Sequence, residues 1–419
     1  MAPQAGERQR ALDGIRVLDV TQVMAGPYCA MQLCDMGADV IKVEPPGGDS
    51  TRRMAGASGT DSPSYNAVNR GKRGIVLDLK DAAAQEACRR LAARTDILIE
   101  NYRPGVMRAF GLDYERLSAA NPGLIYASIS GYGQTGPYAA KGGFDLVAQG
   151  LSGLMSITGE PGGPPIKVGV PLTDLGAALF AQSAILAALY YRSRTGLGQY
   201  IDASLVDAGV ALSVWEATEF FSSGGVPPKP MGSAHRMSAP YQAIRCADGF
   251  ITMAAANDRL FTRLADALGH PEWNDLPEFA TDAARVANRE ALAARIEAVT
   301  MARPRAEWLA RFDACGVPCG PINNYAQVFA DPHIAARGMV AEVEHPTLGV
   351  LRTLGAPVKL SATPSVVNRP APLLGQHTEE VLAEAGFSPA EIATLLRGSA
   401  TMRRPDGDQG SGLGARGSD

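Results

Sequence analysis

Histidine is missing from more than half of this sequence, because all five histidines lie at or after His235. A catalytic acid, base or nucleophile before that point must therefore be a carboxylate, lysine, tyrosine, cysteine or serine. Cysteine is also sparse: the six cysteines form no CxxC pair, and only Cys315 and Cys319 lie close together. We expect reduced, structural thiols and no metal site.

Neither a basic surface nor a membrane segment is indicated. Asp and Glu outnumber Lys and Arg by 43 to 39, which gives no basic stripe of the kind that binds nucleic acid. The longest uncharged run, residues 175–191, is shorter than the roughly 20 residues that span a membrane and is interrupted by Gln182 and Ser183. The N-terminus, MAPQAGERQR, lacks the apolar core of a signal sequence. We expect a cytoplasmic protein with no nucleic-acid partner and no membrane partner.

What the sequence does contain is the alternation of strand and helix patterns that is typical of an α/β fold. It predicts a Rossmann-like, mostly parallel sheet that is covered on both faces and binds ligands at the carboxyl ends of its strands. Short apolar runs suited to buried strands occur at 15–20, 39–44, 75–79, 97–100, 124–130 and 198–205. Helical patterns occur at 27–36, 82–94, near Gly105 and Tyr114, and at 206–221, which reads as one long helix.

The Gly/Pro-rich stretch SSGGVPPKP, residues 222–230, indicates a domain boundary. After it, two strand patterns flank Ala-Asp-Gly, which predicts a hairpin, and helical patterns follow. We expect a small α+β domain beside the large α/β domain. The predicted limits are 1–222 for the first part of the large domain, 223–330 for the small domain, 331–399 for a return to the large domain and 400–419 for a disordered tail.

Two features imitate a dinucleotide-binding domain. The first predicted strand–helix–strand unit ends on Glu44, but its turn, TQVMAGP, has one glycine where the pyrophosphate fingerprint needs three. Gly131, Gly133 and Gly136 have the GxGxxG spacing, but the polar, Gly-rich PYAAKGG follows where that motif requires a helix. We therefore do not expect NAD binding.

The stretch KVGVPLTDLGAALFAQSAILAALYY, residues 167–191, has a single carboxylate, Asp174. A strand-like approach at 168–172 leads to this acid, and an apolar helical pattern follows it. Asp174 could cap that helix, which would stabilise it by about 1 kcal/mol. It could equally serve as a nucleophile toward an activated acyl group. The two roles are geometrically compatible, and this stretch alone leaves both open.

Nine motifs spread along the chain point to a known family. The motifs are LDGIRVLDVTQVMAGP, GADVIKVEPPGGD, NRGKRGIVLDLK, ENYRPGVMRAFGLDY, ASISGYGQTGPY, VPLTDLGAA, RTGLGQYIDASL, GVPCGPINN and APLLGQHTEEVL. With these motifs in this order, the sequence resembles the class III CoA-transferases, the CaiB/BaiF type that includes formyl-CoA:oxalate CoA-transferase, over nearly its whole length up to about residue 400. The resemblance implies that the large domain binds CoA and that two ring-like protomers form an interlocked homodimer.

The resemblance implies that Asp174 is the catalytic aspartate, which forms an acyl-aspartyl anhydride and then an aspartyl-CoA thioester. A carboxylate that is ionised near neutral pH suits this chemistry, which needs no histidine base. CoA and acyl-CoA are then substrates, and no tightly bound cofactor is expected. Positions that match the family's CoA site are Val23, Met24, Ala25, Lys72, Asn101, Tyr102, Arg108 and Lys141. The basic residues among them suit phosphate groups.

Departures from the family pattern narrow the expected activity. Met24 and Pro45 stand where formyl-CoA transferase has polar or basic residues. Related racemases carry a Gly-His-Asp motif, whereas this chain has Gly-Phe-Asp at 143–145. The glycine-rich flap of formyl-CoA transferase is replaced by MGSAHRMSAPYQAI. With GPINN, VEHPTLG and PLLGQHT, this flap most resembles those of succinyl-CoA:glutarate and related dicarboxylate CoA-transferases.

We therefore predict a class III CoA-transferase that moves CoA from an acyl-CoA, with succinyl-CoA the expected donor, to a dicarboxylic acid. Such an acid needs a cationic partner for its distal carboxylate, because burying that group unpaired costs several kcal/mol. The candidates are Arg52 and Arg53 after GGDS, and His235 and Arg236 in the flap, with the flap pair preferred. The alternatives are an acyl-CoA racemase or isomerase on the same scaffold, and a CoA-binding protein without turnover.

Overall fold

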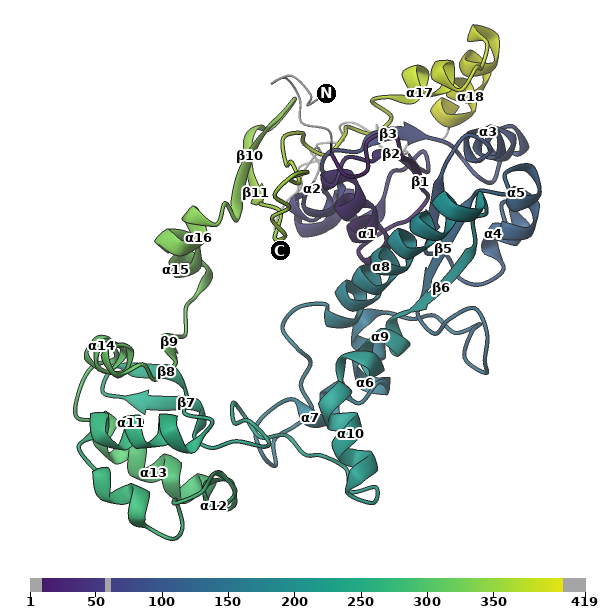
Figure 1. The fold of residues 1–419 in the computed structure, drawn as a ribbon. Coiled ribbons are helices and arrows are strands. Elements are labelled where there is room, and N and C mark those ends of the chain that lie inside the picture. The colour runs from purple at the N-terminus through teal and green to yellow at the C-terminus, as the bar shows by residue number, and fades with distance from the viewer. Residues whose placement is uncertain (1–9, 57–61, 402–419) are drawn as a thin grey trace, which may run out of the picture. The chain divides into compact units, whose positions relative to one another are not determined.

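A computed structural model describes residues 10–56 and 62–401, which form two compact units (Figure 1). The larger unit holds the described chain up to Ser152, Gly169–Ser213 and the part from Ala336 onward. The smaller unit holds Gly153–Val168 and Val214–Ala335. The Gly/Pro-rich stretch at 222–230 thus lies within the smaller unit. Apart from its first two residues, the tail expected from residue 400 lies outside the described residues.

The larger unit is built on a six-stranded parallel sheet, which confirms the predicted fold class. The strand order is β3-β2-β1-β4-β5-β6, so the order reverses between β1 and β4. In open α/β sheets, ligands bind outside the carboxyl ends of the strands at such a switch point. The strands are β1 (Arg16–Asp19), β2 (Asp39–Glu44), β3 (Arg73–Val76), β4 (Ile97–Glu100), β5 (Ile125–Ser130) and β6 (Tyr200–Ser204).

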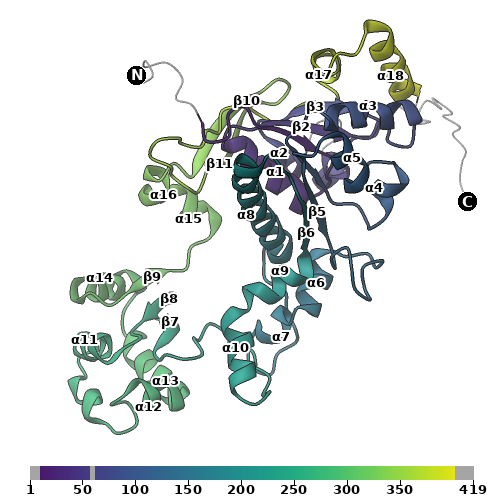
Figure 2. The same ribbon diagram turned by 45° about the vertical axis from the view of Figure 1, so that its right-hand side comes forward.

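Helices cover both faces of this sheet, and each face has its own apolar core (Figure 2). Successive strand residues point to opposite faces, so Val17 lies in one core and Leu18 in the other. This two-sided burial explains why the strands read as continuous apolar runs. One core is closed by α1 (Ala25–Asp35), α8 (Leu172–Thr195) and α9 (Leu205–Leu212), and the other by α3 (Ala82–Ala92), α4 (Val106–Ala109), α5 (Tyr114–Ala120) and α17 (Thr378–Glu384).

Helix α8 is the apolar helix that the sequence predicts after Asp174. Among the described residues it is the one helix that is long and apolar enough to cross a membrane, by length and composition only. Its small residues allow close packing: a Cβ at Gly176 would come within 2.9 Å of Leu212 Cδ1. Ala177, Ala178 and Ala181 are likewise buried in the core between α8 and the sheet. Core helices pass the same hydropathy test, so the composition of α8 is weak support for a membrane span.

Two local predictions are wrong. The single helix expected at 206–221 is two helices, α9 and α10 (Val214–Ser222), because Ser213 leaves the helical conformation at φ −90° and ψ 34°. The two units also divide between Ser213 and Val214. The strand-like approach at 168–172 is not a strand, since Pro171 is the N-cap of α8 and Leu172 is already helical. A strand needs a neighbouring strand to pair its backbone N–H and C=O groups. An apolar pattern such as that of 168–172 is therefore not sufficient to form a strand.

The smaller unit is α+β, as the sequence predicts. Its antiparallel sheet has the order β7-β8-β9, and the hairpin of β7 (Tyr241–Cys246) and β8 (Gly249–Ala254) contains the predicted Ala-Asp-Gly turn. Trp308, Phe312 and Phe261 fill the core of this unit. Its other elements are α7 (Leu154–Ile157), α11 (Asp258–Leu268), η2 (Pro271–Asp275), α12 (Asp282–Ala287), α13 (Arg289–Thr300), α14 (Arg305–Cys315), β9 (Cys319–Pro321), α15 (Tyr325–Ala330) and α16 (Pro332–Ala336).

The last part of the chain completes the edge of the parallel sheet beside β3. The N–H of Gly71 donates to the carbonyl of Pro370 at 2.9 Å, and the N–H of Gly74 donates to His377 Nδ1 at 3.1 Å. Val76 N–H reaches the hydroxyl of Thr378 at 3.2 Å. The remaining elements of the larger unit are η1 (Ser50–Gly56), α2 (Pro63–Asn69), α6 (Asp145–Leu151), the hairpin β10 (Val340–His345) and β11 (Gly349–Leu354), and α18 (Pro389–Thr401).

Candidate active site

Asp174 lies in the first turn of α8 but does not cap the helix. The N-cap is Pro171, which has no side-chain hydrogen bond. The cap comes from α6 instead: Asp145 Oδ1 accepts the backbone N–H of Thr173 at 3.0 Å and its hydroxyl at 2.8 Å. No residue in the described part of the chain forms a hydrogen bond or ion pair with the Asp174 carboxylate. The capping alternative is therefore wrong, and the carboxylate is available for chemistry.

The environment of Asp174 changes its acidity. Burial, and secondly the negative charge of Asp145, raise the pKa of Asp174 to about 7. The expectation that Asp174 is readily ionised near neutral pH thus needs correction, because burial and the charge of Asp145 both favour the protonated form. A carboxylate with a strongly raised pKa beside a second acid is typical of functional sites.

The predicted CoA-contacting loop after β1 has an unusual backbone. Val23 has φ +70°, the one positive φ of a non-glycine residue in the described parts of the chain, and its side chain is 37% exposed. Met24 follows as the N-cap of α1, and Ala25 is the first, buried residue of that helix. Gly26 must be glycine, since a Cβ there would lie 2.3 Å from Thr21 Cβ. The loop therefore has a specific conformation, in which Val23 adopts a left-handed backbone that valine does not favour.

Lys72 and Asn101 are occupied by protein partners. The buried ammonium of Lys72 pairs with Asp19 at 2.8 Å and donates to the carbonyl of Pro27 and to Asn69, each at 2.9 Å. Burial lowers the pKa of Lys72, against the opposing effect of Asp19. The Asn101 amide bonds to both backbone groups of Gln22, at 2.8 and 2.7 Å. Both side chains hold loops at the carboxyl ends of β1 and β4 rather than facing solvent.

The other predicted CoA positions are more open. Tyr102 is half-buried, and its hydroxyl accepts from Gln22 Nε2 at 3.2 Å. Arg108 is 70% exposed, with a long 3.5 Å ion pair to Glu115. The exposed Lys141 places its ammonium 3.7 Å from the centre of the Tyr138 ring. Arg108 and Lys141 are therefore the cations of the predicted set that are free to meet phosphates.

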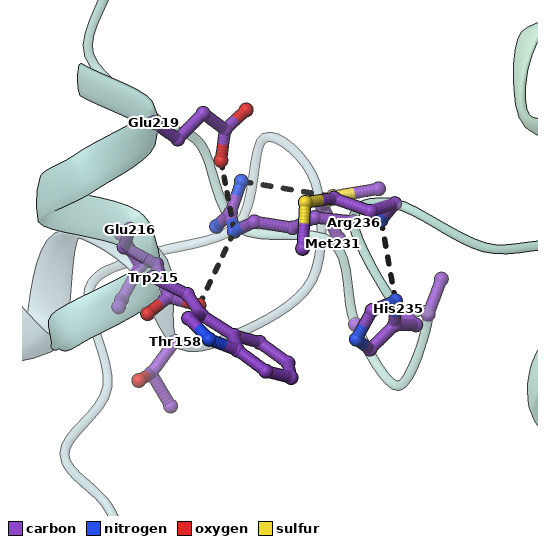
Figure 3. A pocket seen from close by; sticks show the side chains of 11 residues that line it. Thr158, Trp215, Glu216, Glu219, Met231, His235 and Arg236 are labelled. Atoms are coloured by element: carbon purple, nitrogen blue, oxygen red, sulfur yellow. Dashed lines mark hydrogen bonds and ion pairs between the residues drawn. The ribbon is translucent and has the colours of Figure 1, made fainter. Parts of the chain in front are cut away.

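His235 and Arg236 line a pocket of about 240 Å³ in the smaller unit, beside Trp215 of α10. Figure 3 shows the guanidinium of Arg236 extending toward the acids of that helix. Its Nε lies 3.7 Å from Glu216 and 3.9 Å from Glu219, and its Nη2 donates to the carbonyl of Lys229 at 2.6 Å. Among the described residues, Nη1 has one partner, the sulfur of Met231 at 3.7 Å. The His235 ring stacks on Tyr241.

The two arginines near residue 52 differ sharply. Arg52 is buried, pairs with Glu44 at 2.7 Å and lies 3.6 Å over the Tyr65 ring. These contacts stabilise the fold. The expectation that the Arg52 side chain is exposed to solvent or binds the substrate is therefore wrong. Arg53 is exposed and donates to the carbonyl of Gly47 at 2.5 Å.

Sequence reasoning missed several residues of the site. Asp145 reaches Thr173 across 28 positions of the chain, and Glu216 and Glu219 come from a different element than Arg236. Glu100, at the carboxyl end of β4, was also missed. Burial raises its pKa to about 7, and it accepts the N–H of Tyr102 at 2.8 Å. An acid at the end of a parallel strand was the one available signal for Glu100.

The larger unit combines a parallel sheet with a carboxylate, Asp174, in the first turn of α8 that has no partner among the described residues. This combination fits an enzyme of acyl-group chemistry. The comparisons give the family: the chain belongs to CoA-transferase family III, whose model matches residues 12–378. The resemblance found in the motifs is thereby confirmed. In this family, CoA thioesters are substrates rather than tightly bound cofactors.

Relatives and solved structures agree with this assignment. The chain is 42% identical to the succinate–glutarate CoA-transferase of Agrobacterium fabrum, over 90% of this chain and 96% of that protein. It is also 42% identical to the human succinyl-CoA:glutarate CoA-transferase, over 90% and 86%. A CaiB/BaiF family protein from Brucella suis is 41% identical, with a TM-score of 0.80 over 90% of this chain and all of that one.

Proposed function

We propose that this enzyme moves CoA from succinyl-CoA to a dicarboxylic acid, with Asp174 as the covalent nucleophile. The observation that supports the mechanism is the state of Asp174, whose carboxylate is partly buried, has its pKa raised to about 7 and forms no hydrogen bond or ion pair with the described residues. The substrates follow from relatives named for succinyl-CoA with glutarate or mesaconate as the acceptor. All of these acceptors have two carboxylates.

The reaction needs no proton transfer. A carboxylate oxygen of Asp174 attacks the thioester carbonyl of the donor, the C–S bond breaks, and CoA leaves as a thiolate. The thiolate attacks the aspartyl carbonyl of the anhydride, which releases the donor acid and leaves an aspartyl-CoA thioester. The acceptor carboxylate then displaces CoA to form a second anhydride. Attack of the thiolate on the acceptor's acyl carbon finally gives the new acyl-CoA and restores Asp174.

The position of Asp174 suits this cycle. It lies at the N-terminus of α8, where the helix dipole favours negative charge, while burial and Asp145 oppose that charge. The ionised form is therefore a more basic nucleophile than an exposed aspartate. Because Asp145 is bonded to Thr173, it fixes the first turn of α8 without touching Asp174 itself.

CoA would lie at the switch point of the sheet, against Val23, Met24, Ala25 and Tyr102. The exposed cations Arg108 and Lys141 would meet its phosphates. Lys72 and Asn101 contribute indirectly in this arrangement, by holding the neighbouring loops.

The distal carboxylate of the acid would bind Arg236 in the pocket shown in Figure 3. Nη1 of Arg236 retains donor capacity because its one described partner is a sulfur at 3.7 Å. Glu216 and Glu219 lower the net positive charge of the pocket, so an incoming carboxylate must compete with them. His235, on the same wall, and the exposed Arg53 are the secondary candidates for this contact.

Exchange of label between free succinate and succinyl-CoA tests the proposal directly. A transferase that forms the aspartyl-CoA thioester catalyses this exchange without any acceptor, whereas a racemase or a non-catalytic CoA-binding protein does not. The racemase alternative also lacks its acid/base histidine, since Phe144 occupies that position and is 72% exposed. We further propose that the enzyme is cytoplasmic and works as an interlocked homodimer.

A further inference from the structure

One peptide group, between Gln22 and Val23, is held on both edges by side chains of other loops. Its carbonyl oxygen accepts from Asn101 Nδ2 at 2.7 Å. Its N–H points at the carboxylate of Asp49, whose two oxygens lie 3.4 and 3.3 Å away. The carbonyl and N–H of a trans peptide point in opposite directions, so these two side chains together fix the rotation of the peptide plane.

Both described side-chain hydrogen bonds of Asn101 go to the backbone of Gln22. Besides its bond to the Gln22 carbonyl, its Oδ1 accepts the Gln22 N–H at 2.8 Å. A primary amide has both a donor and an acceptor, so it can hydrogen-bond to the N–H and the C=O of one residue as a neighbouring β-strand would. Asn101 follows β4 and Gln22 follows β1, which are neighbours at the switch point of the sheet.

Asp49 is equally constrained. Its carboxylate lies 3.1 Å from the ammonium of Lys42, and both side chains are fully buried. It also accepts the N–H of Thr51 at 3.0 Å and the hydroxyl of Thr51 at 2.8 Å. A carboxylate held by three donors can orient a fourth, the Val23 N–H, without moving.

The conformation that results is strained at Val23. Its φ of +70° lies in the left-handed region, where a β-branched side chain is rarely found. The side chain is 37% exposed, so tight packing of the valine does not impose this backbone. Strain of this kind persists where surrounding contacts over-determine it, and it gathers at ligand sites.

We infer that Asn101 and Asp49 are positioning residues for CoA, which hold the Gln22–Val23 peptide in the orientation that the nucleotide contacts. The inference rests on the proposed function, in which this loop packs on CoA. In this arrangement the Asn101 amide forms hydrogen bonds with the protein backbone and not with CoA. Release of either side chain lets the peptide rotate, relaxes Val23 and removes the surface that CoA meets.

A double-mutant cycle on CoA affinity, measured by calorimetry, tests this inference. Asn101→Ala and Val23→Gly should each weaken binding about tenfold, the first by freeing the peptide and the second by loosening the loop. The double variant should bind within about threefold of Val23→Gly alone, since glycine has no strain to be held against. A loss of about a hundredfold, the product of the single effects, would show direct contact between Asn101 and CoA and overturn the inference.

Asn121→Ala is the matched control. The Asn121 side chain also forms hydrogen bonds with the backbone, since it donates to the carbonyls of Ala92 and Thr95 at 3.3 and 2.8 Å. It lies outside the proposed site. Its replacement should leave CoA affinity unchanged. If Asn101→Ala fails to fold, Asp49→Asn, which keeps the shape of the side chain, takes its place in the cycle. Unchanged affinity in both single variants would remove this loop from the CoA site altogether, and label exchange by the same variants would still report on the proposed transfer.

Discussion

The carboxylate of Asp145 accepts the backbone N–H of Thr173 at 3.0 Å, one residue before the acid whose pKa it raises. Asp145 thus has two separable effects. It caps the first turn of α8 through its oxygen atom, and it acts on Asp174 through its charge. An amide keeps the first effect and removes the second, which makes the pair open to experiment.

Replacing Asp174 by Ala should abolish CoA transfer and leave the fold and CoA binding intact. The side chain does not cap α8 and forms no hydrogen bond or ion pair with the described residues, so its loss removes only the proposed nucleophile. Turnover by label exchange and thermal unfolding by circular dichroism measure the two outcomes. A folded Asp174→Ala protein with appreciable transferase activity would refute covalent catalysis by this residue.

Asp145→Asn should shift the pH profile of kcat/KM. In the proposed mechanism activity requires ionised Asp174, so activity should rise with pH through a pKa of about 7 in the native enzyme. Removing the neighbouring charge lowers that pKa and moves the acidic limb to lower pH. The shift should be partial, because burial is the larger cause and remains. If the acidic limb of the kcat/KM profile does not move in a variant that unfolds at the native temperature, the two acids do not interact.

Asp174→Asn should stabilise the protein at high pH. The pKa of Asp174 is raised from 3.8 to about 7 on folding, so the native state binds the proton more tightly than the unfolded state. The stability linked to that proton is complete below about pH 4 and is lost as the pH rises through about 7. The free energy of unfolding of the variant should therefore rise relative to that of the native protein between these pH values, by at most about 4 kcal/mol above pH 7. Denaturant unfolding at pH 5 and pH 8 measures the difference, and an equal difference at both pH values would contradict the raised pKa.

If the pocket around Arg236 binds the acid, as proposed, substitutions of neighbouring residues in it should have opposite effects on KM. Arg236→Met should raise KM for a dicarboxylate acceptor about tenfold to a hundredfold, with little change for a monocarboxylate of equal length. Glu219→Gln should lower KM for the dicarboxylate, since it removes a competitor for the guanidinium. Equal losses for both acceptors in Arg236→Met would assign this arginine to CoA or to the fold.

The proposed dimer predicts a particle of twice the chain mass by light scattering at micromolar concentration. Because interlocked chains must thread while they fold, preformed dimers carrying different tags should not exchange subunits. A stable monomer would disprove the assembly, whereas rapid exchange would leave a dimer but rule out interlocking.

Local patterns were sufficient for most of the larger unit. The strand β2 and the start of α3 fall where the apolar periodicity predicts them, and nine motifs together identified the family. Contacts between distant residues were not accessible in the same way. Lys72 reads as a solvent-facing loop cation until the fold brings Asp19 to 2.8 Å, and nothing near Val23 predicts its left-handed backbone. The break at Ser213 was missed because the apolar pattern continues through it.

The hydrogen bonds that join Gly71, Gly74 and Val76 to residues 370–378 also bear on biosynthesis. The β3 edge of the sheet is covered by a segment that the ribosome makes about 300 residues later. Until then the nascent chain presents an open strand edge, which is a template for wrong pairing. Chains truncated before residue 370 should consequently aggregate more readily than the full chain.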